Sequence, residues 1–352
     1  MISEAFTTSN EVNILYQSSE RYAPIMGVSI TSMLENNKHL ENINIYIIDG
    51  GISVENRVKL KKLSQAFHTN IFFINGKTID DILSKRGVKK WRDSYAMYYK
   101  IYALDLIDRP IKRLLAIDAD TIINKTRDSL YKSDLDNKIL GMVQDFMPSS
   151  YIKKIGMEEK ETYYNSGVVL FDVEKWKLHD CRARIEQFLQ NNMDCILYAD
   201  QDAISVVLQK EIKKLPINYN YYTVFSALND CLSFSLEDIY RLYDLSDLYQ
   251  FYPLDELRDS EDEAVVYHYE GGTVTGRPWE KGEQCRIFAI WERYKELSFW
   301  NNMEKFDSNL MAFHDIELKL KKVLPLSVFT IIYKKAYDLY WNRILKIRPN
   351  NK

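Results

Sequence analysis

The sequence predicts an α/β protein with a mixed, mostly parallel sheet flanked by helices and with a helical appendage at its C-terminal end. Short runs rich in β-branched residues alternate with longer segments whose apolar spacing suits helices. Most positions in the short runs are apolar, which is typical of strands buried on both faces of a parallel sheet. Beyond residue 310 the composition becomes basic and aromatic, which indicates a separate C-terminal segment.

Six runs are expected to form strands, and four longer segments are expected to form helices. The expected strands are 12–17, 43–49, 70–75, 113–118, 139–145 and 167–173. The expected helices are 22–37, 53–67 and 95–107, with a fourth that opens within 198–208. Ser53 is a candidate N-cap, because its hydroxyl can accept from a free backbone N–H of the first helical turn. Segment 230–263 is acidic and lacks periodicity, so short surface helices and loops are expected there.

Length and composition limit the classes of protein that the chain can be. A chain of 352 residues is long enough for one large domain plus an appendage, or for two modest domains. The net charge of −3 argues against a nucleic-acid-binding protein, whose binding surface would be strongly basic. The four cysteines are widely spaced without a CxxC pair, so we expect buried thiols in a reducing compartment: Cys181, Cys195, Cys231 and Cys285.

The sequence has no recognisable targeting or membrane-spanning segment. Residues 1–17 lack the basic and apolar regions of a secretory signal. The apolar stretch "VLPLSVFTIIY" near the end is much shorter than the roughly 20 residues that a membrane-spanning helix needs. We therefore expect a cytoplasmic protein.

Two aspartates, Asp118 and Asp120, follow the apolar run "RLLAI" at the expected end of a strand. Residues two apart on an extended chain point the same way, and ligands of open α/β sheets bind beyond the carboxyl ends of the strands. Two carboxylates on one face repel each other unless a cation lies beside them, and hard divalent ions prefer oxygen ligands. A DxD pair alone is more often a turn that carries two solvated acids.

Three other stretches accompany this DxD pair: "YYNSGVVLFDVEKWK" (163–177), "YADQDAISVVL" (198–208) and "VVYHYEGGTVTGRPW" (265–279). Together, and in this order, the four stretches resemble glycosyltransferase family 8. The N-terminal segment "ILYQSSERYAPIMGVSITSMLENN" also resembles the first strand and helix of that family. The resemblance spans roughly residues 12 to 280. It implies a retaining enzyme with a GT-A (Rossmann-like) fold, similar to bacterial galactosyl- and glucosyltransferases of cell-surface glycans.

The resemblance implies a metal site made of Asp118, Asp120 and His268, which would hold Mn²⁺ or Mg²⁺ against the diphosphate of a UDP-sugar. A bound divalent cation offsets the negative charge that develops on the leaving UDP. Without the family, a single histidine in an apolar strand would more often be a hydrogen-bonded core residue. Gly271 would let backbone amides approach the phosphates. Arg277 stands in place of the family's usual lysine, and a guanidinium also binds phosphate.

The same resemblance implies a set of residues around the donor sugar. Asp145, Asn165 and Ser166 match positions that bind its hydroxyls, and Asp200 and Gln201 match the catalytic positions near the anomeric carbon. Glutamine is a poor nucleophile, so departure and attack on one face through an oxocarbenium-like state is favoured over a covalent intermediate. For Asp200 the alternative is a role in stabilising the N-terminus of its helix.

Three further positions concern the nucleotide. Lys100 stands where relatives usually have an arginine near the donor, and Ser19 replaces an aspartate that often contacts uracil. Tyr22 remains as a candidate for stacking on the base. UDP is therefore expected as the nucleotide, with its base contacts altered.

These residues predict the transfer of a hexose, galactose or glucose, from a UDP-sugar to a glycan or lipid-linked acceptor in polysaccharide or lipooligosaccharide synthesis. Residues 1–283 would form the catalytic domain and residues 284–352 the helical tail. Two other functions fit parts of the sequence. One is a non-catalytic nucleotide-sugar-binding protein on the same fold. The other is a DxD phosphatase of the haloacid dehalogenase superfamily, although its loop normally lies near the start of the chain.

The C-terminal segment 317–352 contains nine lysines and arginines and two acids, together with several aromatic residues. Cationic amphipathic helices with interfacial aromatics suit the surface of an anionic bilayer, and a lipid-linked acceptor would make such anchoring useful. The enzyme would then be peripheral on the inner face of the membrane. The alternative is a helix that packs on the catalytic domain or in a homo-oligomer interface.

Overall fold

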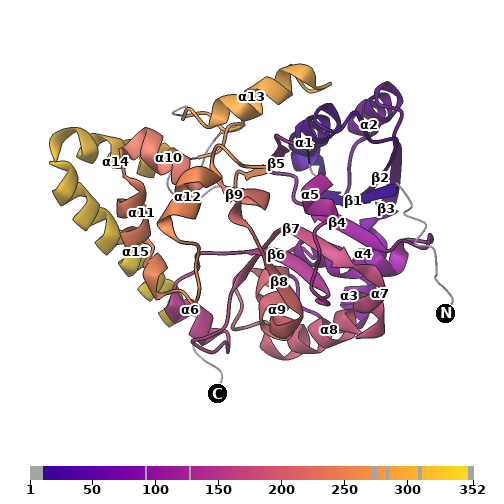
Figure 1. The fold of residues 1–352 in the computed structure, drawn as a ribbon, viewed down its shortest axis with the longest axis horizontal. Coiled ribbons are helices and arrows are strands. Elements are labelled where there is room, and N and C mark those ends of the chain that lie inside the picture. Colours follow the sequence, from indigo (N-terminus) through magenta and orange to yellow (C-terminus); the bar gives the residue numbers. More distant parts are fainter. Residues whose placement is uncertain are drawn as a thin grey trace.

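A computed structural model describes residues 11–91, 93–126, 128–270, 276–282, 285–307 and 311–347. A twisted sheet lies at the centre of the part of the chain that precedes the C-terminal helices, and helices cover both of its faces (Figure 1). On the side away from the first strands, helices from the last third of the chain form a second layer (Figure 1).

The central sheet has seven strands in the order β3-β2-β1-β4-β7-β6-β8. Strand β7 is antiparallel to both of its neighbours, and the other pairs are parallel. The strands are β1 (Glu11–Ser18), β2 (Asn42–Asp49), β3 (Asn70–Asn75), β4 (Arg113–Ile117), β6 (Leu140–Gln144), β7 (Tyr164–Asp172) and β8 (Ile212–Leu215). Because β7 is reversed, its first residues lie beside the carboxyl ends of β4 and β6.

The structure has a small second sheet, whose strands lie in the order β5-β10-β9. Its first strand in the sequence, β5, follows β4 directly along the chain. It consists of β5 (Thr121–Ile123), β9 (Tyr221–Tyr222) and β10 (Val266–His268). Strand β10 runs antiparallel to β5, with His268 opposite Thr121. This pairing brings a residue from late in the chain next to the aspartates that precede β5.

The helices occupy the connections between strands and most of the chain after β7. Those in the first half are α1 (Ala23–Glu35), α2 (Val54–Ala66), α3 (Gly76–Lys85), α4 (Tyr99–Leu106), α5 (Asp128–Tyr131) and α6 (Ser149–Lys154). The later ones are α7 (Val173–Leu178), α8 (Cys181–Asn192), α9 (Ala199–Val207), α10 (Thr223–Leu232), α11 (Leu236–Leu242), α12 (Leu254–Ser260), α13 (Phe288–Leu297), α14 (Met311–Val323) and α15 (Leu326–Ile347). Ser53 caps α2 as predicted, because its side chain accepts from the N–H of Asn56.

The six predicted strands and four predicted helices are confirmed, with ends that differ by a few residues. The prediction of burial on both faces is wrong for β3. This strand lies at the edge of the sheet, and its Phe72 and Phe73 are partly exposed. An apolar run does not reveal whether a strand is central or at an edge, because that depends on which partners cover it.

The C-terminal helices pack on the acidic segment 230–263. The rings of Phe234 and Phe329 stack with centroids 5.6 Å apart, and Tyr337 meets Tyr243 edge-on at 5.1 Å. Lys334 pairs with Asp244 at 2.8 Å. The alternative in which the tail packs on the preceding domain is therefore confirmed. The short helices predicted for this segment are confirmed as α11 and α12, but the segment does not lie wholly at the surface, because Leu245 is fully buried.

The prediction of four free thiols is wrong for one pair. Cys231, in α10, and Cys285, just before α13, form a disulfide across 54 residues of sequence, with Cα atoms 6.1 Å apart. Cys181 and Cys195 are free. Wide spacing in the sequence did not reveal the pair, because the approach of two Cα atoms depends on how distant segments pack. Among the helices described, none is long and apolar enough to cross a bilayer.

Candidate active site

A cavity of about 780 Å³ opens at the carboxyl edge of the sheet, between the sheet and the C-terminal helices. This volume is typical of a site for a ligand the size of a cofactor. Ten of the residues predicted from the sequence line it: Ser19, Tyr22, Asp118, Asp120, Asp145, Asn165, Ser166, Gln201, His268 and Arg277. Lys100 and Asp200 are not on its wall, and Gly271 lies outside the described residues.

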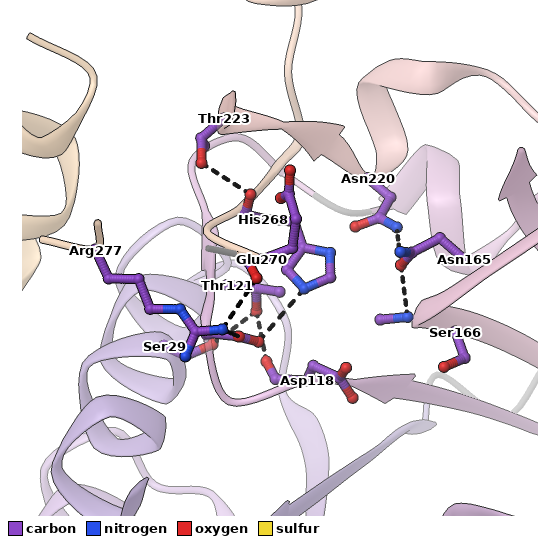
Figure 2. Close-up of polar contacts among 12 residues, drawn as sticks. Ser29, Asp118, Thr121, Asn165, Ser166, Asn220, Thr223, His268, Glu270 and Arg277 are labelled. Atoms are coloured by element: carbon purple, nitrogen blue, oxygen red, sulfur yellow. Dashed lines mark hydrogen bonds and ion pairs between the residues drawn. The ribbon is translucent and has the colours of Figure 1, made fainter. Parts of the chain in front are cut away.

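Asp118, Asp120 and His268 form a compact group of candidate metal ligands. One donor atom from each lies within 4.8 Å of the other two. The distance between His268 Nε2 and Asp120 Oδ1 is 3.4 Å. Figure 2 shows the imidazole of His268 between the guanidinium of Arg277 on one side and Asn165 on the other.

Two backbone hydrogen bonds and one close contact hold these candidate ligands in place. The N–H of Asp118 donates to the carbonyl of Gly167 in β7 at 2.8 Å, and the N–H of Tyr269 donates to the carbonyl of Asp120, also at 2.8 Å. A Cβ atom on Gly167 would lie 2.3 Å from Cε1 of His268. Only glycine leaves room for the imidazole at this point of β7, so Gly167 has a steric function.

The charges around this group match a cation site. Burial favours a neutral His268, but the hydrogen bond and charge of Asp120 outweigh it and raise the pKa of His268 to about 9. Burial also opposes ionisation of Asp120, yet His268 and Arg277 hold the pKa of Asp120 below its usual value. The buried Nδ1 of His268 has no hydrogen-bond partner. Two carboxylates and one imidazole are a suitable donor set for Mn²⁺ or Mg²⁺, so the residues fit the predicted metal.

Lys100 lies behind the cavity wall and pairs with two acids. Its Nζ lies 2.9 Å from Asp118 Oδ1 and 3.3 Å from Asp200 Oδ2, and it donates to the carbonyl of Ser166 at 2.6 Å. Asp200 is fully buried, and this burial raises its pKa to about 6 despite the charge of Lys100. This geometry places Lys100 and Asp200 behind the cavity wall, where Lys100 holds the Asp118 carboxylate and the carbonyl of Ser166.

A continuous hydrogen-bond network lines part of the cavity wall. Gln201 Nε2 donates to Asp145 Oδ2 at 2.8 Å, and its Oε1 accepts from the N–H of Ser166 at 3.0 Å. Asn165 donates to the same Asp145 oxygen at 3.0 Å. Burial raises the pKa of Asp145. These hydrogen bonds restrain the rotamers of Asp145, Asn165 and Gln201 on the cavity wall.

Tyr22 and Arg277 connect the far end of the cavity to the metal-ligand group. Arg277 donates to the hydroxyl of Tyr22 at 2.5 Å and lies 3.7 Å from Asp120 Oδ2. Its second donor binds the carbonyl of Glu270 at 3.0 Å (Figure 2). Arg277 is therefore held between the candidate metal site and the tyrosine predicted to stack on the base.

Sequence reasoning missed several wall residues. Glu270 lines the cavity with both carboxylate oxygens buried and without a hydrogen-bond partner. Its position two residues after His268, on the same side of an extended chain, is a signal that could have identified it. Tyr337, Tyr340 and Trp341 of α15 also line the cavity, and no local motif marks them.

The family model of glycosyl transferase family 8 matches residues 13–282, which is most of the chain. The chain belongs to glycosyltransferase family 8. Lipopolysaccharide 1,2-glucosyltransferase of Escherichia coli K12 is 27% identical over 318 residues, which are 89% of this chain and 84% of that protein. General stress protein A of Bacillus subtilis is 22% identical over 83% of this chain and 96% of its own length.

A solved structure of the galactosyltransferase LgtC, in complex with donor and acceptor sugar analogues, aligns with a TM-score of 0.63. The identity is 19%, and the alignment covers 82% of this chain and 96% of LgtC. The likeness confirms the GT-A fold that the sequence predicted for this family 8 glycosyltransferase.

In the metal-free glycosyltransferase, we expect the free energy of unfolding to fall as the pH rises from about 6.5 to about 8. The pKa of His268 rises on folding from 6.5 to about 9, and burial raises the pKa of Glu270 from 4.5 to about 8. Both groups therefore bind more protons in the folded state within this window, so stability declines as they lose them.

Melting temperatures measured in EDTA across this pH range check that expectation. Glu270→Gln should flatten the decline, whereas Glu263→Gln, at an exposed glutamate outside the cavity, should leave the decline unchanged. A melting temperature that stays constant or rises with pH in the wild-type protein would contradict it.

Proposed function

We propose that this family 8 glycosyltransferase transfers a hexose, galactose or glucose, from a UDP-sugar to a glycan or lipid-linked acceptor with retention of the anomeric configuration. The observation that carries the proposal is the group Asp118, Asp120 and His268 at the edge of a cavity that also contains the Gln201 and Asn165 network. The E. coli relative, named as a lipopolysaccharide glucosyltransferase, supports a role in cell-surface glycan synthesis.

In the proposed mechanism, Asp118, Asp120 and His268 hold a divalent cation, Mn²⁺ or Mg²⁺. When bound, the cation supplies Lewis-acid stabilisation of the charge that develops on the leaving diphosphate. Arg277 adds a second positive charge beside Asp120, in position to bind phosphate oxygens. Tyr22 and Ser19 line the same cavity, and in this mechanism they contact the nucleotide base.

Asp145, Asn165 and Gln201 bind and orient the donor sugar. The side-chain amides of Asn165 and Gln201 already donate hydrogen bonds to the Asp145 carboxylate. The three side chains are therefore preorganised and can bind the sugar hydroxyls without first rearranging. Gln201 presents an amide instead of a carboxylate, so a covalent glycosyl-enzyme at this residue is not favoured. Departure of UDP and attack of the acceptor hydroxyl on the same face of the sugar then give retention.

A screen of UDP-sugars with the purified protein, Mn²⁺ and glycan acceptors tests this function. The measured quantity is the UDP that each reaction releases. We expect release from UDP-galactose or UDP-glucose, and proton NMR should show an α-linkage in the product formed from the α-linked donor. A β-linked product would contradict retention. Binding of UDP-sugars without turnover would favour the non-catalytic alternative, and phosphatase activity without use of UDP-sugars would favour the DxD phosphatase.

We also propose that the outer side of the C-terminal helices contacts an anionic membrane surface. Val328, Ile332 and Leu339 follow one another at helical spacing on α15 and are 42%, 42% and 69% exposed. Lys335, which is also exposed, lies on the same helical stripe. Exposed aliphatic side chains beside basic ones are typical of helices that lie in the bilayer interface.

Sedimentation with anionic vesicles checks this proposal. We expect the protein to bind at low salt and to be released partly at high salt, because salt screens the basic residues but not the apolar contact. The double variant Ile332→Ser and Leu339→Ser should bind more weakly. Leu297→Ser, at a 59% exposed leucine in α13, is the matched control. Equal binding by all three proteins would contradict membrane contact through α15.

A further inference from the structure

One wall of the active-site cavity comes from the C-terminal helix α15, which follows the segment matched by the family model. Tyr337, Tyr340 and Trp341 line the same cavity as Gln201 and Asp118, although they lie more than 130 residues later in the sequence. Figure 1 shows α15 running along α11 towards α6, on the side of the molecule opposite β1 to β3.

The three rings differ in how firmly they are held. Trp341 is 7% exposed and packs against Tyr151 of α6 with centroids 5.6 Å apart. Tyr337 packs edge-on against Tyr243. Tyr340 packs against Trp341 at 5.8 Å and is 46% exposed. The wall is thus a rigid aromatic base with one ring, Tyr340, left accessible from the solvent and the cavity.

The residues proposed to bind the nucleotide do not belong to this wall. Ser19 and Tyr22 come from the end of β1 and the start of α1, and Arg277 connects Tyr22 to the metal-ligand group. The wall of α15 comes instead from the C-terminal layer, beyond the sugar-binding network. A polar group nevertheless faces the same space, because both oxygens of Glu270 are buried without partners on the cavity lining.

We infer that α15 supplies an acceptor subsite, in which Tyr340 stacks on the apolar face of a pyranose ring of the acceptor glycan. This inference rests on the proposed function and specifies its acceptor as a glycosyl residue. Aromatic side chains offer a large apolar surface at little conformational cost, and a few polar groups beside them fix the orientation of the ligand. Glu270 has the unsatisfied acceptor atoms that a sugar hydroxyl requires.

Helix α15 carries both the proposed acceptor subsite and the proposed membrane-contacting residues. The exposed aliphatic residues Ile332 and Leu339 lie on α15 next to the segment that reaches the cavity. An acceptor glycan attached to a lipid would therefore meet the subsite on the helix that contacts the bilayer. Loss of α15 should impair use of the acceptor and not only attachment to the membrane.

The test uses the full-length protein loaded with UDP and Mn²⁺ and four probes: the methyl α- and β-pyranosides of glucose and galactose. Saturation-transfer NMR measures binding of each probe to the wild type and to three variants. We expect Tyr340→Ala to weaken the best probe about three- to tenfold, as expected for the loss of one stacking contact. Tyr340→Phe, which keeps the ring, and Leu339→Ala, which replaces an exposed neighbour off the cavity wall, should bind it like the wild type.

Hydrolysis of the UDP-hexose in the absence of an acceptor separates this inference from the proposed function. Tyr340→Ala should release UDP by hydrolysis at the wild-type rate, while transfer to an acceptor declines. If the wild type does not use any UDP-hexose, the proposed function fails, whatever the probes show. If the wild type uses one, two results would overturn the subsite: no saturable binding of any probe, or unchanged binding and transfer by Tyr340→Ala.

Discussion

Replacement of Asp120 by asparagine is expected to lower the rate of sugar transfer by about a thousandfold, because a metal-bound leaving group contributes several kcal/mol to the transition state. Asparagine keeps the shape of the side chain but removes the charge that draws a cation to Asp118 and His268. The carbonyl of Asp120, which accepts from Tyr269, is unaffected. Circular dichroism should therefore show a folded protein.

Excess EDTA should reduce the wild type to a similar level of activity, and added Mn²⁺ should restore it. Asp194→Asn is the matched control, since Asp194 is 65% exposed and pairs only weakly with the exposed Lys89 at 3.2 Å. It should retain full activity. Full activity of the wild type in excess chelator, or of the Asp120 variant in Mn²⁺, would remove the metal from the mechanism.

Replacement of Gln201 by alanine is expected to lower kcat about a hundredfold while the affinity for UDP changes less than about threefold. Gln201 contacts the Asp145 carboxylate and the N–H of Ser166, and both belong to the wall that we propose for the sugar rather than for the nucleotide. Interactions that strengthen only in the transition state raise kcat and leave ground-state binding unchanged. Transfer kinetics measure kcat, and titration calorimetry measures the affinity for UDP.

Gln209→Ala provides the comparison for this variant. Gln209 makes similar hydrogen bonds, to the carbonyls of Thr162 and Ser205, but does not line the cavity. Its replacement should lower the melting temperature and leave kcat nearly unchanged. If the Gln201 and Gln209 variants lose kcat equally, Gln201 has only a structural role. If Gln201→Ala loses UDP affinity and kcat together, its contact belongs to the ground state.

The local sequence predicted most of the fold and the pair Asp118 and Asp120, and the resemblance to family 8 added His268 as the third candidate metal ligand. The apolar run that ends in Asp118 and Asp120 is a strand followed by a pair of carboxylates at the carboxyl edge of the sheet. In the same way, "NSG" before "VVLFD" predicted a strand whose first residues reach the cavity. Periodicity and residue type suffice in these cases because the presence of a strand and the place where it ends are set by the local sequence.

Local sequence did not distinguish residues on the cavity wall from residues behind it. Lys100 and Asp200 were predicted to contact the donor, but they pair with each other in the layer below. Their position depends on how α4 and α9 pack against β4 and β7. A buried lysine needs anionic partners, and here Asp118 and Asp200 provide them.

The sequence by itself determined the α/β class, the places of the main strands and helices along the chain, and the carboxylate pair Asp118 and Asp120, and its resemblance to family 8 added His268. Only the tertiary structure decided that Cys231 meets Cys285, that α15 packs on segment 230–263, and that Tyr340 and Glu270 face one cavity. The reason is physical. The period of side chains along a helix or strand reports which face is buried, whereas contacts between residues far apart in sequence depend on the packing of whole elements.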